Sequence, residues 1–342
     1  MARREPEVVV ITGASAGVGR ATAREFARRG ARIGLVARDR ASLEATRREI
    51  EALGGHGLVL PADVSDAGQM EAVAVEAEAV LGPIDIWVNN AFAGMFATFL
   101  DMTDAEFQRV TAVTYFGQVN GTRAALRRMI LRNRGCVVLV GSALAYRGIP
   151  LQSAYCGAKH ALQGFQDSLR AELLHAHSRV RVTMVQLSAM NTPQFDWVRA
   201  RVPGRPRPVA PIFQPEVAAR AIWFAAHANR KEVVVGAPAV EAIVGDKLAS
   251  GLLDGYLARR GVTAQYETPG EPPLRDNLFQ PVPGLHRTRG RFSGEARSHA
   301  PGLWASRHRA WIAGAATLAA ATALVVGLSA RVGRLPVSER SS

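Results

Sequence analysis

Residues 8–19 have the sequence VVVITGASAGVG and decide the fold that we expect for this chain. The β-branched run at their start predicts a buried strand. Three glycines follow in the spacing T-G-x-x-x-G-x-G, and helical periodicity continues over residues 20–29. A strand, a glycine-rich turn and a helix in this order predict a dinucleotide-binding unit. The glycines let backbone amides approach a pyrophosphate, and the N-terminus of the helix attracts its negative charge.

Beyond this unit, strand and helix patterns alternate along the chain. Strands are expected at residues 32–37, 56–60, 84–89, 135–141, 180–187 and 232–235, and helices at residues 41–53, 66–81, 103–132, 153–177 and 215–228. Strict alternation predicts an α/β fold with a doubly wound, Rossmann-type parallel sheet of seven strands and helices on both faces. Gly13, Asp63, Asn89 and Ser142 each follow a predicted strand. They are expected to converge on one crevice, because ligands of such sheets bind beyond the carboxyl ends of the strands.

A second group of residues that points to chemistry follows the fifth strand. That strand ends at Ser142, and a helix is predicted to begin at Ser153, which we expect to be its N-cap. Tyr155 and Lys159 stand four residues apart on this helix, so their side chains share a face. An ammonium and a helix N-terminus both favour a phenolate, so the pair predicts proton transfer. Taken alone, an incidental tyrosine and lysine on a surface helix is the alternative interpretation.

The combination of motifs is more specific than any one of them. In order along the chain they are Thr12-Gly-x-x-x-Gly-x-Gly19, Asp63-Val64, Asn89-Asn90-Ala91, Ser142 and Tyr155-x-x-x-Lys159. With these intervals the chain resembles the short-chain dehydrogenase/reductase family over about residues 6–250. The resemblance implies an oxidoreductase that transfers a hydride between a nicotinamide cofactor and a small-molecule carbonyl or secondary alcohol. An NADP-binding sensor or scaffold with little turnover is the alternative function.

The resemblance also implies roles for individual residues. Ser142 would position and polarise the substrate oxygen, Tyr155 would exchange its proton, and Lys159 would hold the nicotinamide ribose and lower the pKa of the tyrosine. The implied cofactor-binding residues are Gly13, Ser15, Ala16, Gly17, Val18, Gly19, Arg38, Asp63, Val64, Asn90, Ala91, Tyr155, Lys159 and Thr192. No metal site is expected.

The residues after the second strand favour NADP(H) over NAD(H). An acidic residue at this point would accept a hydrogen bond from the ribose 2′-hydroxyl and favour NAD. Here Ala37 takes that place and Arg38 follows, and a guanidinium pairs well with a 2′-phosphate. A solvated arginine is the alternative interpretation. The family assigns Asp63 and Val64 to the adenine, whereas the residues alone suggest that Asp63 caps the following helix.

Three positions depart from the family pattern. Phe92 stands where a glycine is usual, and Thr114 stands where an asparagine is thought to bend the long helix and hold a water linked to the lysine. A threonine there can bond its own helix carbonyl at i−4 and bend the helix. The usual Pro-Gly is also absent at residues 187–188. Phe92 and Thr114 keep the sensor or scaffold interpretation open.

Residues 194–214 form an irregular, proline-rich stretch that is too long for a simple connection and predicts a substrate lid. Phe195, Trp197 and Phe213 in this stretch suggest an apolar substrate. Ordinary packing of the lid would explain the same residues.

Past residue 250 the composition changes. We expect a catalytic domain at residues 1–250, a Pro-, Gly- and Arg-rich linker at 251–303, and a candidate transmembrane helix at 304–334. Residues 310–330 carry no charge and would extend about 32 Å as a helix, enough for a hydrocarbon core of ~30 Å. The arginines before this run outnumber those after it, which predicts a membrane-anchored catalytic domain in the cytoplasm. A soluble alanine-rich helix and a surface-bound helix are the alternatives.

Charge and cysteine content limit the other partners. The net charge is +13, and only three of the 42 basic residues are lysines. No basic stripe interleaved with aromatic residues occurs before residue 250, so no nucleic-acid partner is expected. The two cysteines suggest neither disulfides nor a metal site, and the short polar N-terminus leaves no room for a secretory signal. A homo-oligomer is compatible with the sequence.

Overall fold

The computed structural model describes residues 5–236, 250–284 and 286–308. The described residues up to Ala300 form one compact unit, and a second unit begins at Pro301 with the short helix α9 (Pro301–Arg307). The uncharged run at 310–330, on which the predicted membrane anchor rests, lies outside the described residues. None of the helices among the described residues combines the length and the hydrophobicity that a membrane span requires.

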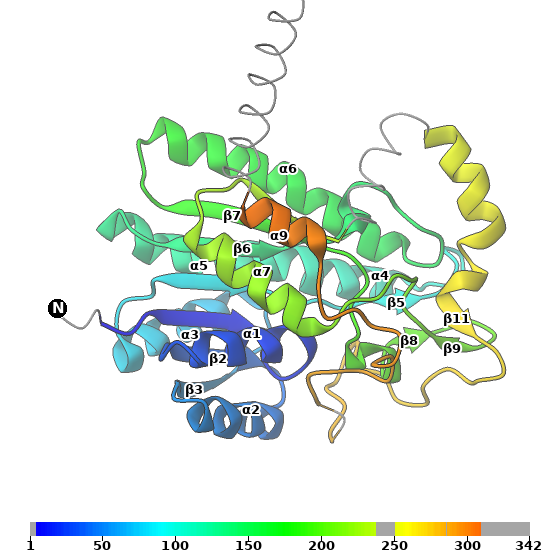
Figure 1. The fold of residues 1–342 in the computed structure, drawn as a ribbon, viewed down its shortest axis with the longest axis horizontal. Coiled ribbons are helices and arrows are strands. Elements are labelled where there is room, and N and C mark those ends of the chain that lie inside the picture. Colours follow the sequence, from blue (N-terminus) through cyan, green and yellow to red (C-terminus); the bar gives the residue numbers. More distant parts are fainter. Residues whose placement is uncertain (1–4, 237–249, 285, 309–342) are drawn as a thin grey trace, which may run out of the picture. The chain divides into compact units, whose positions relative to one another are not determined.

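A seven-stranded parallel sheet forms the centre of the first unit (Figure 1). Its strands are β1 (Val8–Thr12), β2 (Arg32–Ala37), β3 (His56–Pro61), β4 (Ile86–Asn89), β6 (Cys136–Val140), β7 (Arg181–Leu187) and β10 (Glu232–Val235). They lie in the order β10-β7-β6-β4-β1-β2-β3, and all neighbours are parallel. All residues of β1, β4 and β6 are buried, as expected for a sheet covered on both faces. The predicted doubly wound fold is confirmed.

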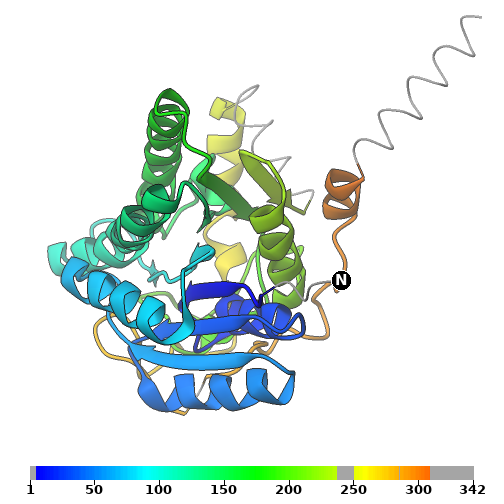
Figure 2. The ribbon, with the colours of Figure 1, turned by 90° about the vertical axis from the view of Figure 1, so that its left-hand side faces the viewer.

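Helices cover both faces of this sheet (Figures 1 and 2). Helices α1 (Gly17–Ala27), α2 (Arg40–Ala52) and α7 (Pro215–His227) lie on one face, and α3 (Ala67–Leu81), α5 (Gly117–Arg132) and α6 (Ser153–His175) lie on the other. Two of the predicted caps differ from the structure. Gln152 occupies the N-cap position of α6 and makes no side-chain cap, so Ser153 is the first helical residue. The N-cap of α3 is Asp66, which accepts a hydrogen bond from the Gln69 amide, so Asp63 is free for other contacts.

The long helix predicted at 103–132 is interrupted. Helix α4 (Asp104–Thr111) leads into a π-helical turn at Ala112–Phe116, and α5 follows. The Thr114 hydroxyl does not bond its own helix. It donates to the Ala93 carbonyl at 2.8 Å and accepts from the Ala93 amide at 3.0 Å. The π-helical turn therefore forms where Thr114 ties the helix to the loop after β4. It depends on this tertiary contact.

The region predicted as a linker packs against the sheet domain. Residues 250–260 are helical, and β11 (Tyr266–Glu267) pairs with β9 (Arg205–Pro206) inside the predicted lid. In the same lid, β8 (Arg199–Ala200) pairs with β5 (Met95–Phe96). Further along, Leu278 is fully buried in the main core and Phe292 packs on Phe195. We call the described residues 276–284 and 286–288 the strap, and they belong to the same compact unit as the sheet.

Candidate active site

Ser142 and Tyr155 line the same cavity beyond the end of β6. Ser142 lies two residues after the buried strand, and its Oγ accepts a hydrogen bond from the Leu144 amide at 3.1 Å. Tyr155 lies in the first turn of α6. Burial raises the pKa of Tyr155 well above its usual value, and the Ser142 side chain only partly opposes this shift. We expected a lowered tyrosine pKa, but without a ligand the tyrosine is protonated at neutral pH and is poised to act as an acid.

Lys159 lies one helical turn beyond the tyrosine and is 2% exposed. Its Nζ donates to the Val140 carbonyl at 2.6 Å and lies 5.6 Å from the centroid of the Tyr155 ring. Burial lowers the pKa of Lys159 to about 7. The ammonium is thus held by β6 rather than by the tyrosine hydroxyl, which explains why it does not favour the phenolate here.

Phe92 stands beside this pair. Its ring meets the Tyr155 ring edge to face at a centroid distance of 5.8 Å and lines the same cavity. Where the family pattern has a glycine, this chain therefore places an aromatic ring against the tyrosine. The next glycine, Gly94, has open space where a Cβ would be.

The glycine-rich turn packs tightly against the loop after β4. Gly13 has a φ of +68°, and a Cβ added to it would lie 2.9 Å from Asn90 Nδ2. A Cβ on Gly19 would lie 2.1 Å from the Gly13 carbonyl oxygen, so only glycine fits there. Asn90 Nδ2 donates to the Thr12 carbonyl at 3.0 Å. Asn90 thus has a clear structural role.

Arg38 and Asp63 lie at the other end of the cleft. The Asp63 carboxylate contacts Arg109 at 2.5 Å and accepts hydrogen bonds from Ser65. Burial would raise the pKa of Asp63, but these bonds to Arg109 and Ser65 lower it below its usual value. Arg38 is half-buried and donates to backbone carbonyls of the strap, so it is not simply solvated.

A cavity of about 490 Å³ joins the two ends of the cleft. Its walls contain Ser142 and every residue expected at the cofactor site except Gly19. The lid residues Phe195 and Trp197 also line it. Phe213 does not line it. It is buried beside Gly236, where an added Cβ would lie 2.8 Å from its ring.

Residues 7–202 match the family model described as short chain dehydrogenase. YxnA of Bacillus subtilis, an uncharacterized oxidoreductase, is 32% identical over 295 residues, which cover 85% of this chain and 83% of that protein. The chain belongs to the short-chain dehydrogenase/reductase family. The members of this family are NAD(P)-dependent oxidoreductases that act on carbonyl or alcohol groups.

Other members resemble parts of this dehydrogenase/reductase. Probable oxidoreductase EphD of Mycobacterium tuberculosis is 45% identical over 167 residues, which are 48% of this chain but only 28% of EphD. A solved metagenomic short-chain oxidoreductase in complex with NADP is 30% identical, with a TM-score of 0.56 over 67% of this chain and 96% of that one. A short-chain dehydrogenase/reductase from Burkholderia phymatum in complex with NAD has a TM-score of 0.65 at 22% identity, covers 75% of this chain and 97% of that one, and supports the fold alone.

The residues of this short-chain dehydrogenase/reductase fit a nicotinamide dinucleotide. The Thr192 hydroxyl is buried, lines the cavity side of the glycine-rich turn and has no hydrogen-bond partner among the described residues. A Cβ on Gly17 would lie 3.0 Å from the Thr192 methyl, so the glycine-rich turn packs closely against Thr192. An unpaired buried hydroxyl and a turn without side chains suit a ligand that supplies polar atoms at close range.

Sequence reasoning missed the contribution of the strap to this short-chain dehydrogenase/reductase. Asn277, Pro281, Val282 and His286 line the cavity beside Arg38. The strap has no helical or strand periodicity, and its isolated apolar residues were the only available signal.

Proposed function

We propose that this protein uses NADP(H) to transfer a hydride between nicotinamide and the carbonyl or secondary alcohol of an apolar substrate. The observation that carries this proposal is that Ser142, Tyr155 and Lys159 line one cavity together with the glycine-rich turn. The intact set favours an enzyme, because a sensor or scaffold would not require it.

The proposed mechanism assigns one task to each side chain. The bound nicotinamide would supply or accept the hydride. In reduction, the protonated Tyr155 gives its proton to the substrate oxygen, and Ser142 donates a hydrogen bond to the same oxygen. In oxidation, both transfers reverse. Lys159, whose pKa burial lowers to about 7, is suited to return a proton toward the tyrosine near neutral pH.

The cofactor would be held along the cleft. The glycine-rich turn from Gly13 to Gly19 would take the pyrophosphate and Thr192 the carboxamide. Asp63 and Val64 would face the adenine, with Asn90 and Ala91 along the cleft between. Preference for NADP(H) rests on Arg38 and on the absence of an acid at Ala37. Burial lowers the pKa of Arg38, the positive charge of nearby Arg109 lowers it further, and Asp63 opposes both effects.

An apolar substrate is supported by the walls near the catalytic pair. Phe92, Phe96, Ile149, Phe195 and Val198 line the cavity there. Ketones and aldehydes with hydrophobic substituents would bury apolar surface against them.

The test is a panel of ketones, aldehydes and alcohols with NADPH or NADP⁺. With the best substrate, Tyr155→Phe should lose turnover by roughly 10²-fold or more, the scale of a positioned acid/base, and keep cofactor binding. Tyr266→Phe changes a tyrosine outside the cavity and serves as the matched control. Near-normal turnover in a folded Tyr155→Phe protein would refute the assignment. Cofactor binding without turnover across the whole panel would favour the sensor or scaffold instead.

We also propose that residues 304–334 hold the catalytic unit at a membrane, with that unit in the cytoplasm. The support is the uncharged run at 310–330, with tryptophan and arginine around it. The full chain and a version ending at Pro301 would be fractionated and washed with high salt and then with alkaline carbonate. A full chain that is soluble at low salt would refute the anchor, and release by salt alone would indicate surface binding.

A further inference from the structure

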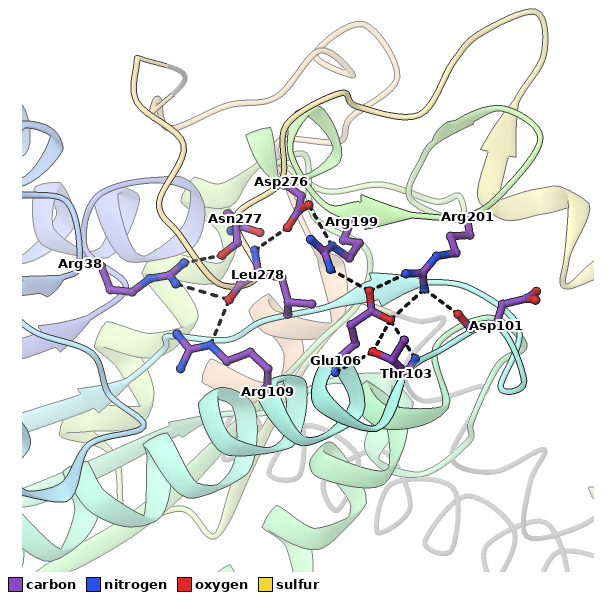
Figure 3. A network of polar contacts seen from close by, with 10 residues as sticks. All are labelled: Arg38, Asp101, Thr103, Glu106, Arg109, Arg199, Arg201, Asp276, Asn277 and Leu278. Carbon is purple, nitrogen blue, oxygen red and sulfur yellow. Dashed lines mark hydrogen bonds and ion pairs between the residues drawn. The ribbon is translucent and has the colours of Figure 1, made fainter.

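The strap is fixed to the domain at its N-terminal end by one ion pair and one core residue (Figure 3). Asp276 Oδ2 pairs with Arg199 Nε at 2.9 Å, and Asp276 Oδ1 accepts a hydrogen bond from the Leu278 amide at 3.0 Å. The Leu278 side chain is fully buried in the main core. The backbone of residues 277–279 is therefore held by the Asp276 side chain before it and by the Leu278 side chain within it.

The carbonyls of this backbone point to Arg38. Arg38 Nη1 donates to Phe279 at 2.9 Å and to Leu278 at 3.4 Å, and Nη2 donates to the Asn277 carbonyl. The Leu278 carbonyl also accepts from Arg109 Nε at 3.0 Å, so two guanidinium groups share it (Figure 3). Three neighbouring carbonyls thus fix the plane of the Arg38 guanidinium.

Arg38 keeps donors for a ligand. A guanidinium has five N–H groups, and the three bonds leave the Nε–H and one Nη2 hydrogen without an acceptor among the described residues. Arg38 lines the cavity together with Ser15, Asp39 and His286. An arginine already held in one rotamer loses less conformational entropy when it binds a phosphate.

The C-terminal end of the strap contacts the glycine-rich turn. The Gly17 amide donates to the Arg287 carbonyl at 3.0 Å, and Arg20 Nη1 donates to the His286 carbonyl at 2.9 Å. Gly17 is the first residue of α1. The strap therefore bridges the turn after β1 and the end of β2, the two elements between which the adenosine of a dinucleotide would lie.

We propose that the strap is a positioning element for cofactor recognition, in which Leu278 sets the carbonyls that hold Arg38 for the 2′-phosphate. This inference rests on the proposed preference for NADP(H). It makes the choice between NADP⁺ and NAD⁺ depend on a core leucine far along the chain from Arg38. The opposite arrangement, in which the strap carbonyls compete with the phosphate for Arg38, is an outcome of the test.

The test measures the dissociation constants of NADP⁺ and NAD⁺ by calorimetry. Leu278→Ala should lower the preference for NADP⁺ by about 3- to 10-fold, the range for losing the order of one long side chain. In an Arg38→Ala background it should lower the preference no further, because both changes act through the same guanidinium. Leu274→Ala, at a leucine that is 98% exposed and lies two residues before the strap, should change nothing.

Asp276→Ala provides a second variant in case Leu278→Ala does not fold. It removes the Arg199 ion pair and the acceptor for the Leu278 amide without opening the core, and should lower the preference in the same direction. An unchanged or increased preference in the folded strap variants would overturn the strap inference while leaving Arg38 in place. An unchanged preference in Arg38→Ala would instead refute recognition by Arg38, and the role of the strap with it.

Discussion

The residues at the catalytic end of the cleft and those at the adenosine end are held in place by different contacts. At the catalytic end, Ser142, Tyr155 and Lys159 lie close in sequence on β6 and α6, and Lys159 bonds the buried strand directly. At the adenosine end, Arg38 meets carbonyls from residues 277–279. The first end depends on one strand and the helix that follows it, and the second on contacts between segments that are distant in sequence. Changes at one end should therefore be separable from changes at the other.

Ser142→Ala should show the largest difference between its effect on turnover and its effect on cofactor affinity. Removal of one hydrogen-bond donor to a reacting oxygen typically costs about 10²- to 10³-fold in turnover. The NADP⁺ dissociation constant should stay within about 2-fold, because Ser142 lies away from Arg38 and distant sites act independently. Steady-state kinetics and calorimetry check the two parts, with Ser168→Ala on the exposed face of α6 as control. Equal losses in turnover and in cofactor affinity would show that the two ends are not separate.

The catalytic end was also the more predictable from the sequence. At that end, β6 is observed at Cys136–Val140, within the predicted 135–141, and α6 begins at Ser153 as predicted. The bounds of β2 and β10 equal the predicted ones as well, because apolar runs in a covered sheet have few alternatives. Most motif residues line one cavity, as expected from strands that end at the same edge. Asn89 does not, because its side chain is fully buried and bonds Thr122 and Trp87 instead. The catalytic roles of the motif residues remain predictions. The break in the long helix was not predictable, because it depends on the contact of Thr114 with the Ala93 backbone.

The strap could not be predicted for a similar reason. Its position depends on single residues such as Leu278 and Asp276, each of which contacts a different element, and such contacts leave no periodic signal. A pattern rich in proline, glycine and arginine is typical of a linker. Local propensity therefore describes how this segment would behave alone, and not the surface on which it packs.

Glu106 contacts the adenosine end indirectly, through Arg199, so its removal should weaken that end. It is 2% exposed, forms a capping box with Thr103 and pairs with Arg199 and Arg201 at 2.7 Å each. Arg199 also holds Asp276 of the strap (Figure 3). Glu106→Ala should lower the free energy of unfolding by about 2–4 kcal/mol, as for other buried charged contacts. It should also weaken NADP⁺ binding more than Ser142→Ala does. Urea unfolding and calorimetry measure both effects.

Two further variants show which contacts of Glu106 cause the loss of stability. Glu106→Gln retains a side chain that completes the capping box but loses the charge, so its smaller loss isolates the ion pairs. Glu76→Ala, at an exposed glutamate of α3, should change stability by no more than about 0.5 kcal/mol. If Glu106→Ala matched Glu76→Ala, the contacts in Figure 3 would not hold the adenosine end in solution.

The last expected effect concerns the pH dependence of stability at the catalytic end. Burial lowers the pKa of Lys159 from 10.5 to about 7, so between these values the unfolded chain binds a proton that the folded protein does not. The free energy of unfolding should therefore rise with pH in this window, by up to about 1.4 kcal/mol per pH unit. Below pH 7 both states are protonated and the full cost of burying the ammonium remains.

Lys159→Met removes the group, so its stability advantage over the wild type should be greatest at pH 7 and shrink toward pH 9. Urea unfolding of the cofactor-free proteins at pH 7, 8 and 9 measures this difference. Lys231→Met, at a lysine whose side chain is 58% exposed, should show a constant difference. A constant difference for Lys159→Met as well would mean that Lys159 stays charged when buried, and the catalytic end would then rely on charge as the adenosine end does.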